Sequence, residues 1–318
     1  GQLESPGRVR GYGVRGVIAL MFGVKEKRAK SRSAALLILL AGGLAVALWA
    51  CSAPERSAPG APEEVISVWV SIVPQKYFVE RIGGDRVDVE VMVPPGFSPA
   101  TYEPRPSQVE ALAGADMYVQ IGVPFEDAWM SRIRALNQVM LVVDQSQGID
   151  RIDGRDPHIW LSPRLVKVQA RTIFEALVEL DRDYEGFYRA NLEAFLVDLD
   201  DLDTKIERGL SGLETRKFIV FHPAWSYFAH DYGLEMIPVR VEGGDPSAAE
   251  MAELIRTARA NGIKVIFAQP EFSTQSAETI AREIDGRVLL ISPLAPDWME
   301  NLARVADTFA EVLGKQEQ

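Results

Sequence analysis

Two of the three histidines in the chain stand where an imidazole could hold a metal ion. His158 lies in the segment DPHIW (156–160), just before a helix that we expect to begin near Pro163. His222 directly follows the apolar run FIVF (218–221). Neutral imidazole is a good ligand for zinc and other borderline metals, so both residues are candidate metal ligands. For each one taken alone, a structural hydrogen-bonding role stays open, and we expect His230 to be a surface residue.

Composition and motifs exclude several other chemistries. A single cysteine in 318 residues rules out an intramolecular disulfide framework and a cysteine-rich zinc module. The sequence has no GxSxG, HExxH or CxxC motif and no GxGxxG motif after a strand, so we expect no enzymatic activity. A formal charge of −11 argues against nucleic acid as a partner.

The segments that must position these side chains alternate between strands and helices, which predicts parallel sheets with helical crossovers. We expect strands at 65–70, 87–93, 117–121, 139–143, 218–221, 236–241, 264–268 and 287–291. We expect helices near 74–84, 106–114, 125–135, 224–232, 247–261, 274–284 and 297–313.

A different pattern separates the two halves. Apolar residues recur every three or four positions from Tyr188 to Leu213, which predicts one helix over 184–213. At about 1.5 Å per residue it would be about 45 Å long, more than the width of one small lobe. We therefore predict an α/β fold of two βα lobes, 65–183 and 214–318, joined by one long connecting helix.

The loops that follow the predicted strands are the candidate binding surface, because ligands of open α/β sheets lie beyond the carboxyl ends of the strands. These loops, together with His158, should converge on a cleft between the lobes. They comprise residues 94–104, 222–223, 242–245, 269–271 and 292–293.

The N-terminal segment has the parts of an export signal. Residues 21–50 contain a cationic stretch and then an apolar run from Ala34 to Ala50, too short for a typical membrane span. Cys51 follows in a Leu-x-Ala-Cys sequence that resembles a lipobox, so we expect lipid attachment there. Residues 51–64 are rich in Ser, Ala and Pro and predict a tether, and residues 1–20 are interpreted as upstream sequence.

Several ordered motifs resemble the solute-binding proteins of bacterial zinc and manganese ABC transporters. The resemblance covers about 65–313 and is strongest in PPGFSPATYEPRPSQVEALAGADMYVQIGVPFE (94–126), DPHIWLSP (156–163), FHPAWSYFAHDYGL (221–234), EGGDPSAAE (242–250), QPEFSTQSAETIAREI (269–284) and SPLAPDW (292–298). It implies two βα lobes with one connecting helix and a zinc or manganese ion bound between them. It also implies a lipid-anchored, exported monomer, in the periplasm or at the cell surface, whose partner is a membrane permease.

The sequence departs from this family at two ligand positions. His158 and His222 match the family's metal ligands, whereas Ala100 stands where the family has a histidine and Ser292 where it commonly has an aspartate. Two imidazoles alone make a poor zinc site, so a carboxylate should compensate. We favour Glu271, which follows a predicted strand in the same lobe as His222; Glu103 and Glu242 are the other candidates.

Three functions remain open at this point. The first is capture of a divalent metal ion, zinc rather than manganese, for an ABC importer. The second is binding of a non-metal or chelated ligand by the same scaffold. The third is adhesion or interaction at the cell surface, without transport.

Overall fold

The structure is a computed structural model that describes residues 65–239 and 246–314. The predicted signal segment, Cys51, the tether and Glu242 lie outside the described residues. Within the described ranges, no helix combines the length and hydrophobicity needed to cross a membrane.

The N-terminal lobe is built on a four-stranded parallel sheet in the order β2-β1-β3-β4. Its strands are short and rich in Val, and β1 is almost wholly buried. The strands are β1 (Ile66–Val70), β2 (Val87–Val91), β3 (Met117–Gln120) and β4 (Leu141–Asp144), and the connecting helices are α2 (Val73–Gly83), α3 (Pro106–Ala111) and α4 (Pro124–Leu136). Short 3-10 turns are η1 (Gly84–Arg86), η2 (Leu112–Gly114), η3 (Ile152–Gly154) and η4 (Ile159–Leu161).

The C-terminal lobe repeats this topology, with parallel strands in the order β6-β5-β7-β8. Its strands are β5 (Lys217–Val220), β6 (Glu235–Pro238), β7 (Val265–Ala268) and β8 (Arg287–Leu290). Its helices are α7 (Ser226–Tyr232), α8 (Ala248–Ala260), α9 (Gln275–Glu283) and α10 (Trp298–Leu313). The predicted fold class is therefore confirmed, and the ends of the strands differ from prediction by only a few residues.

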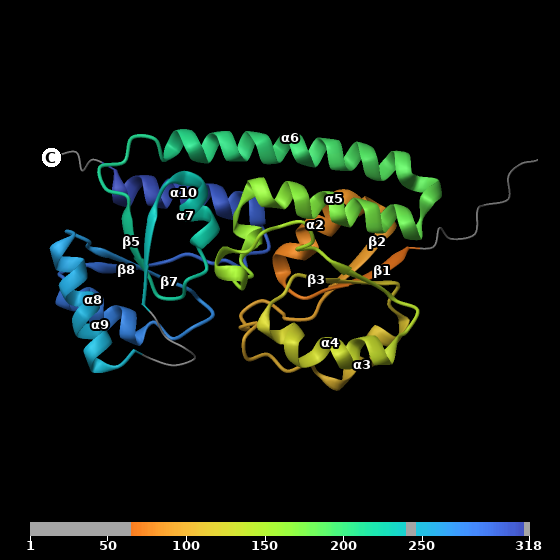
Figure 1. Cartoon of the computed structure of the whole chain (residues 1–318), viewed down its shortest axis with the longest axis horizontal. Helices are drawn as coiled ribbons and strands as arrows, with labels where there is room; N and C mark the ends of the chain where they lie inside the picture. Colours follow the sequence, from red (N-terminus) through yellow and green to blue (C-terminus); the bar gives the residue numbers. More distant parts are fainter. Residues whose placement is uncertain (1–64, 240–245, 315–318) are drawn as a thin grey trace, which may run out of the picture. The chain divides into compact units, whose positions relative to one another are not determined.

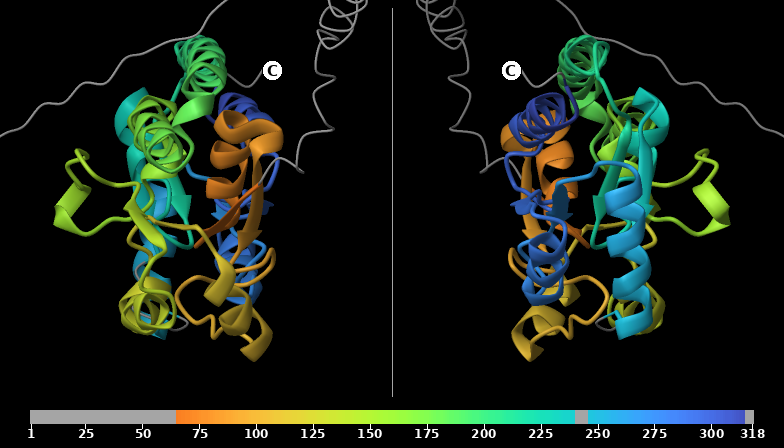
Figure 2. Two further views of the ribbon diagram at one scale, coloured as in Figure 1. Left: turned by 90° about the vertical axis from the view of Figure 1, so that its right-hand side faces the viewer. Right: turned by 90° about the vertical axis from the view of Figure 1, so that its left-hand side faces the viewer.

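Helix α6 (Glu185–Gly209) connects the two lobes. It packs on α2 and α5 (Pro163–Leu180) of the N-terminal lobe and on α10 of the C-terminal lobe (Figures 1 and 2). The predicted apolar stripe is buried along its length, from Tyr188 to Ile206. The helix ends at Gly209, four residues before the predicted limit, and Leu210 in the turn that follows still packs in the core. A 3-10 turn, η5 (Arg182–Tyr184), joins α5 to α6.

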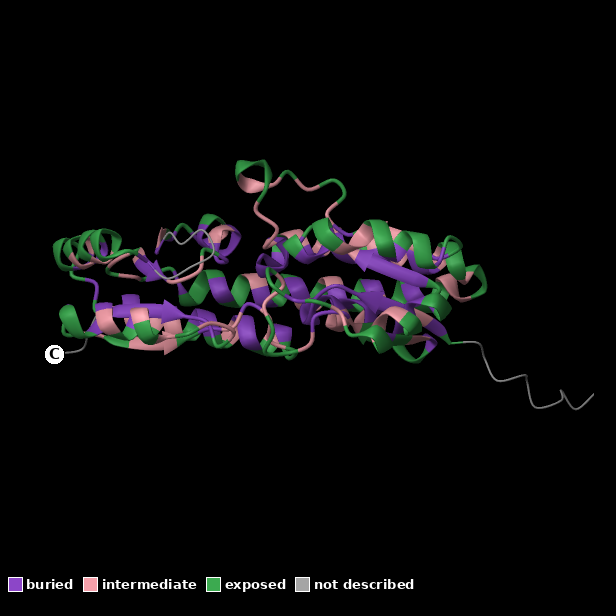
Figure 3. Cartoon of the chain, turned by 90° about the horizontal axis from the view of Figure 1, so that it is seen from below, coloured by how far each residue is buried: buried purple, intermediate pink, exposed green. Residues whose placement is uncertain are grey.

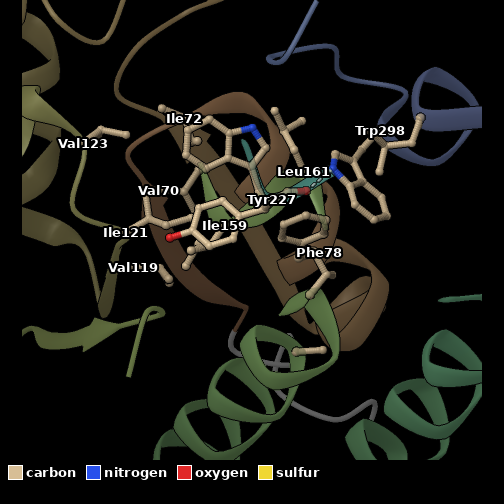
Figure 4. Close-up of a cluster of buried hydrophobic side chains, with 14 of the residues drawn as sticks. Val70, Ile72, Phe78, Val119, Ile121, Val123, Ile159, Leu161, Tyr227 and Trp298 are labelled. Carbon is tan, nitrogen blue, oxygen red and sulfur yellow. Dashed lines mark hydrogen bonds between the residues drawn. The ribbon is translucent and has the colours of Figure 1, made fainter. Parts of the chain in front are cut away.

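One hydrophobic core includes buried residues of both lobes. Figure 3 shows buried segments in each lobe. Phe78 of α2 meets Trp298 of α10 edge to face, with ring centroids 4.9 Å apart. Trp160 donates its indole N–H to the carbonyl of Pro293 at 2.7 Å, and Trp298 donates to the carbonyl of Trp160 at 2.8 Å. Figure 4 shows Trp298 and Tyr227 beside apolar side chains of the first sheet and of η4. The lobes therefore share buried contacts in addition to the connecting helix.

Candidate metal centre

The two candidate histidines come from opposite lobes. His222 follows β5, and Glu271 follows β7, the strand paired with β5. In this strand order the chain leaves β5 and β7 toward opposite edges of the sheet. The crevice at the carboxyl ends of these two strands is where ligands of such sheets bind. His158 immediately precedes η4, in the segment that leads from β4 to α5. Each lobe therefore presents one imidazole at its ligand-facing end.

The structure brings these imidazoles into contact. The Nε2 atoms of His158 and His222 are 3.2 Å apart, and the ring centroids are 5.2 Å apart with nearly perpendicular planes. Two nitrogen ligands of a tetrahedral zinc ion, each about 2.05 Å from the metal, lie about 3.3 Å from one another. The pair is therefore already spaced for a shared zinc ion.

Asp156 fixes the orientation of His158. Its Oδ1 accepts hydrogen bonds from the His158 backbone N–H at 3.0 Å and from Nδ1 at 2.7 Å. Nδ1 of His158 therefore contacts Asp156, and Nε2 of the same ring faces Nε2 of His222. Burial alone would raise the pKa of Asp156, but the hydrogen bonds and the charge of His158 outweigh burial and lower it. A carboxylate behind an imidazole is the usual way to hold a metal-ligating histidine.

His222 is held in its neutral form. Burial, and then the proximity of His158, lower its pKa to about 4. Metal binding requires a neutral imidazole, so His222 need not lose a proton to bind a metal at neutral pH.

Tyr227 of α7 links the C-terminal lobe to the loop that bears His158. Its hydroxyl donates to the carbonyl of Asp156 at 2.9 Å and accepts the backbone N–H of Ile152 at 3.0 Å. Because α7 begins four residues after His222, this one side chain ties the two histidine-bearing segments together.

A cavity of about 250 Å³ adjoins the two imidazoles. Most of its walls are apolar. It is lined by Ser98, Pro99, Ala100, Val123, Pro124, Pro157, His158, Trp160, His222, Gln269, Glu271, Phe272, Pro293 and Leu294. Ala100 is thus among the lining residues, whereas Glu103 is not. Ser292 is not among the lining residues. It precedes Pro293, which lines the cavity, and donates its hydroxyl to Glu271.

Glu271 is the carboxylate on the wall of this cavity. Its Oε1 accepts the hydroxyl of Ser292 at 2.9 Å, and its Oε2 is buried with no hydrogen-bond partner. Within residues 65–239 and 246–314, no group of three or more His, Cys, Asp and Glu side chains is arranged to hold a metal ion. Glu271 therefore does not complete a three-residue site with the two imidazoles in the rotamer observed.

Sequence reasoning missed two residues that organise the site, Asp156 and Tyr227. Asp156 could have been found, because an acid two residues before a candidate histidine can turn back onto its ring. The contact of Tyr227 depends on how α7 packs on the other lobe, and no local pattern signals it.

Comparison with known proteins identifies relatives of the same architecture. The high-affinity zinc uptake system protein ZnuA of Bacillus subtilis is 28% identical over 281 residues, covering 81% of this chain and 88% of its own length. The manganese-binding lipoprotein MntA of Halalkalibacterium halodurans is 34% identical over 168 residues, covering 51% of this chain and 56% of its own length. A crystal structure of a ZnuA deletion mutant with zinc bound superposes with a TM-score of 0.76 at 48% identity, covering 80% of this chain and all of that one.

The family described as ZnuA, the periplasmic component A of the zinc-uptake complex, matches residues 68–312. This range contains both lobes, the connecting helix and the two facing histidines. By this match and by its fold, the chain belongs to the ZnuA family.

Proposed function

We propose that the protein is the solute-binding component of an ABC importer and captures a divalent metal ion with His158 and His222. The observation that carries this proposal is the 3.2 Å separation of the two Nε2 atoms, one from each lobe. Asp156 orients one of these imidazoles, and burial keeps the other neutral. The metal is thus cargo, held between the lobes until it is handed to the permease.

Zinc is the preferred cargo on chemical grounds. Imidazole nitrogen suits zinc, whereas manganese favours carboxylate, carbonyl and water oxygens. Relatives named for zinc and for manganese both occur, so the family alone does not decide between the metals. Two imidazoles and a largely apolar cavity favour zinc.

Glu271 supplies a third donor in this proposal. Its Oε2 is buried without a partner, a costly state that a metal ion would relieve. A rotation of the side chain toward His222 would exchange the hydrogen bond from Ser292 for a bond to the metal. Ala100 then borders the site and Ser292 lies behind Glu271, and neither contributes a donor, so we expect a weaker site than four ligands would give.

The proposed setting is extracytoplasmic. We propose lipid attachment at Cys51, a tether over 51–64, and lobes at 65–183 and 214–318 that act as a monomer beside the permease. This arrangement is supported by the cationic and apolar run before Cys51 and by a relative named as a lipoprotein. Cys51→Ser should release the protein from membranes after signal cleavage, and membrane partitioning that persists would contradict the anchor.

Calorimetric titration with zinc and with manganese tests the metal assignment. We expect one zinc ion per chain, bound more tightly than manganese. His158→Ala and His222→Ala should each weaken zinc binding by about a hundredfold or more. His230→Ala is the matched control, because the side chain of His230 is 77% exposed on α7. Equal effects of all three variants, or no zinc binding at all, would overturn the proposal.

A further inference from the structure

The two imidazoles leave a bound zinc ion short of donors. Structural zinc is almost always four-coordinate, and catalytic zinc keeps about three protein ligands and one small molecule. The pair provides two donors, and no third His, Cys, Asp or Glu of the described ranges is grouped with it. Even with Glu271 recruited, the residues in 65–239 and 246–314 supply three donors and leave one coordination position for another ligand.

The cavity beside the pair is much larger than a single water molecule requires. Its volume is about 250 Å³, against about 30 Å³ for each molecule of liquid water. Ala100 on its wall is exposed, so a small molecule can reach the cavity from solvent. The space therefore suits a compact organic ligand bound next to the metal.

The walls indicate which chemical class of ligand fits. Trp160 lies beside the ring of His158, and Phe272 beside that of His222, with centroid separations of 5.1 and 5.4 Å. Val123, Pro124 and Leu294 add apolar surface. Such surroundings suit a flat ring that carries one donor atom, and an imidazole-type nitrogen is a donor that zinc accepts.

We infer that the site takes its metal together with a small neutral nitrogen-donor ligand of the imidazole class, which enters along the Ala100 wall. This inference rests on the proposed function, since the ligand binds the protein through the metal. It makes a metal complex, rather than a bare ion, the species that the cleft recognises.

Zinc binding to the full protein, measured with and without millimolar imidazole, tests this inference. Native mass spectrometry should detect protein, zinc and imidazole in a 1:1:1 complex. Acetate replaces imidazole as the oxygen-donor control. Ala100→His places a donor on the same wall and Ala100→Trp fills it, and both substitutions are at an exposed position that should tolerate them. Imidazole in solution competes for zinc equally in all samples, so each variant is compared with the parent in the same buffer.

We expect imidazole to change the zinc affinity of the parent by a factor at least about ten times more favourable than its effect on either variant. Acetate should leave the zinc affinity of the parent unchanged. Zinc binding that is indifferent to imidazole, or an equal imidazole effect in all three proteins, would overturn this inference and leave the proposed function intact. Absence of zinc binding with and without imidazole would overturn both.

Discussion

The two lobes share one strand order but bring different chemistry to the cleft. The C-terminal lobe contributes His222, Gln269 and Glu271 from the ends of β5 and β7. In the N-terminal lobe, the loops that follow β2 and β3 present mainly Pro99, Ala100 and other apolar side chains, and His158 is the one imidazole of its wall. The loops that follow the strands therefore determine which metal-donor side chains each lobe supplies. The shared topology determines only that these loops face the cleft.

The lobes also differ in how their cores are built. In the N-terminal lobe, the buried residues on both faces of the sheet belong to the core that continues into α6 and α10. In the C-terminal lobe, the face of the sheet under α8 and α9 forms a second, smaller core that contains Ile219, Ile266 and Ile280. We therefore expect that this layer of the C-terminal lobe can lose its packing without disturbing the contact between the lobes.

Removing the buried aromatic contact between the lobes should have the largest effect on stability. Trp298→Ala should lower the free energy of unfolding by about 3–5 kcal/mol, because it opens the shared core and removes the bond to the Trp160 carbonyl. Ile280→Ala, in the smaller core, is the comparison. In hydrogen exchange we expect Trp298→Ala to reduce protection in both lobes and Ile280→Ala to reduce it around α8 and α9 only. The same pattern in both variants would contradict the division of cores.

The pH dependence of stability should report the burial of His222. Its pKa is lowered from the ordinary histidine value of 6.5 to about 4 in the folded chain, so the unfolded chain binds more protons between these values. The free energy of unfolding should therefore fall as the pH drops from about 6.5 to about 4, by up to about 3 kcal/mol, in the metal-free protein. Urea unfolding of the parent and of His222→Gln tests this. An identical pH slope in both proteins would contradict the assignment.

Adding a metal-binding side chain to the apolar wall of the N-terminal lobe should make the two walls of the cleft more alike. Ala100→His should strengthen zinc binding by about 1–3 kcal/mol, by analogy with the tenfold to hundredfold effects of changes around metal ligands. Ser292→Asp should gain less, because it sets a second carboxylate against Glu271. Calorimetry of both variants decides the order. No gain from Ala100→His with the fold intact would mean that the cleft is not arranged for a metal ion.

Loss of the bridge between the histidine-bearing segments should have the smallest effect. Tyr227→Phe removes the hydroxyl bonds to Asp156 and Ile152 and should weaken zinc binding by about 1 kcal/mol. Tyr232→Phe is the matched control, because it removes a bond from the same helix to Asp203, away from the cleft. We expect similar losses of stability in both variants but a loss of zinc affinity only in Tyr227→Phe. Equal zinc affinities would show that the bridge is purely structural.

The sequence could predict those features that arise from local periodicity. Short valine-rich runs between helices predicted the strands, and the apolar residues that recur every three or four positions from Tyr188 predicted the connecting helix. Parallel topology then placed His158 and His222 at one cleft. The contacts of Trp160 with Pro293 and of Tyr227 with Asp156 could not be predicted, because they depend on the angle between lobes whose residues are far apart in the chain. The hydrogen bond from Ser292 to Glu271 was hidden for the same reason, since it joins the ends of two strands.

The central claim is that the facing imidazoles of the two lobes bind one zinc ion, and anomalous scattering at the zinc edge tests it most directly. Crystals of the protein grown with one equivalent of zinc should show a single strong peak about 2.0–2.1 Å from Nε2 of both His158 and His222. The separation of the two Nε2 atoms should stay close to its present 3.2 Å. A zinc peak that contacts only one of these rings, or a peak elsewhere on the molecule with the two imidazoles still hydrogen-bonded to each other, would contradict the account.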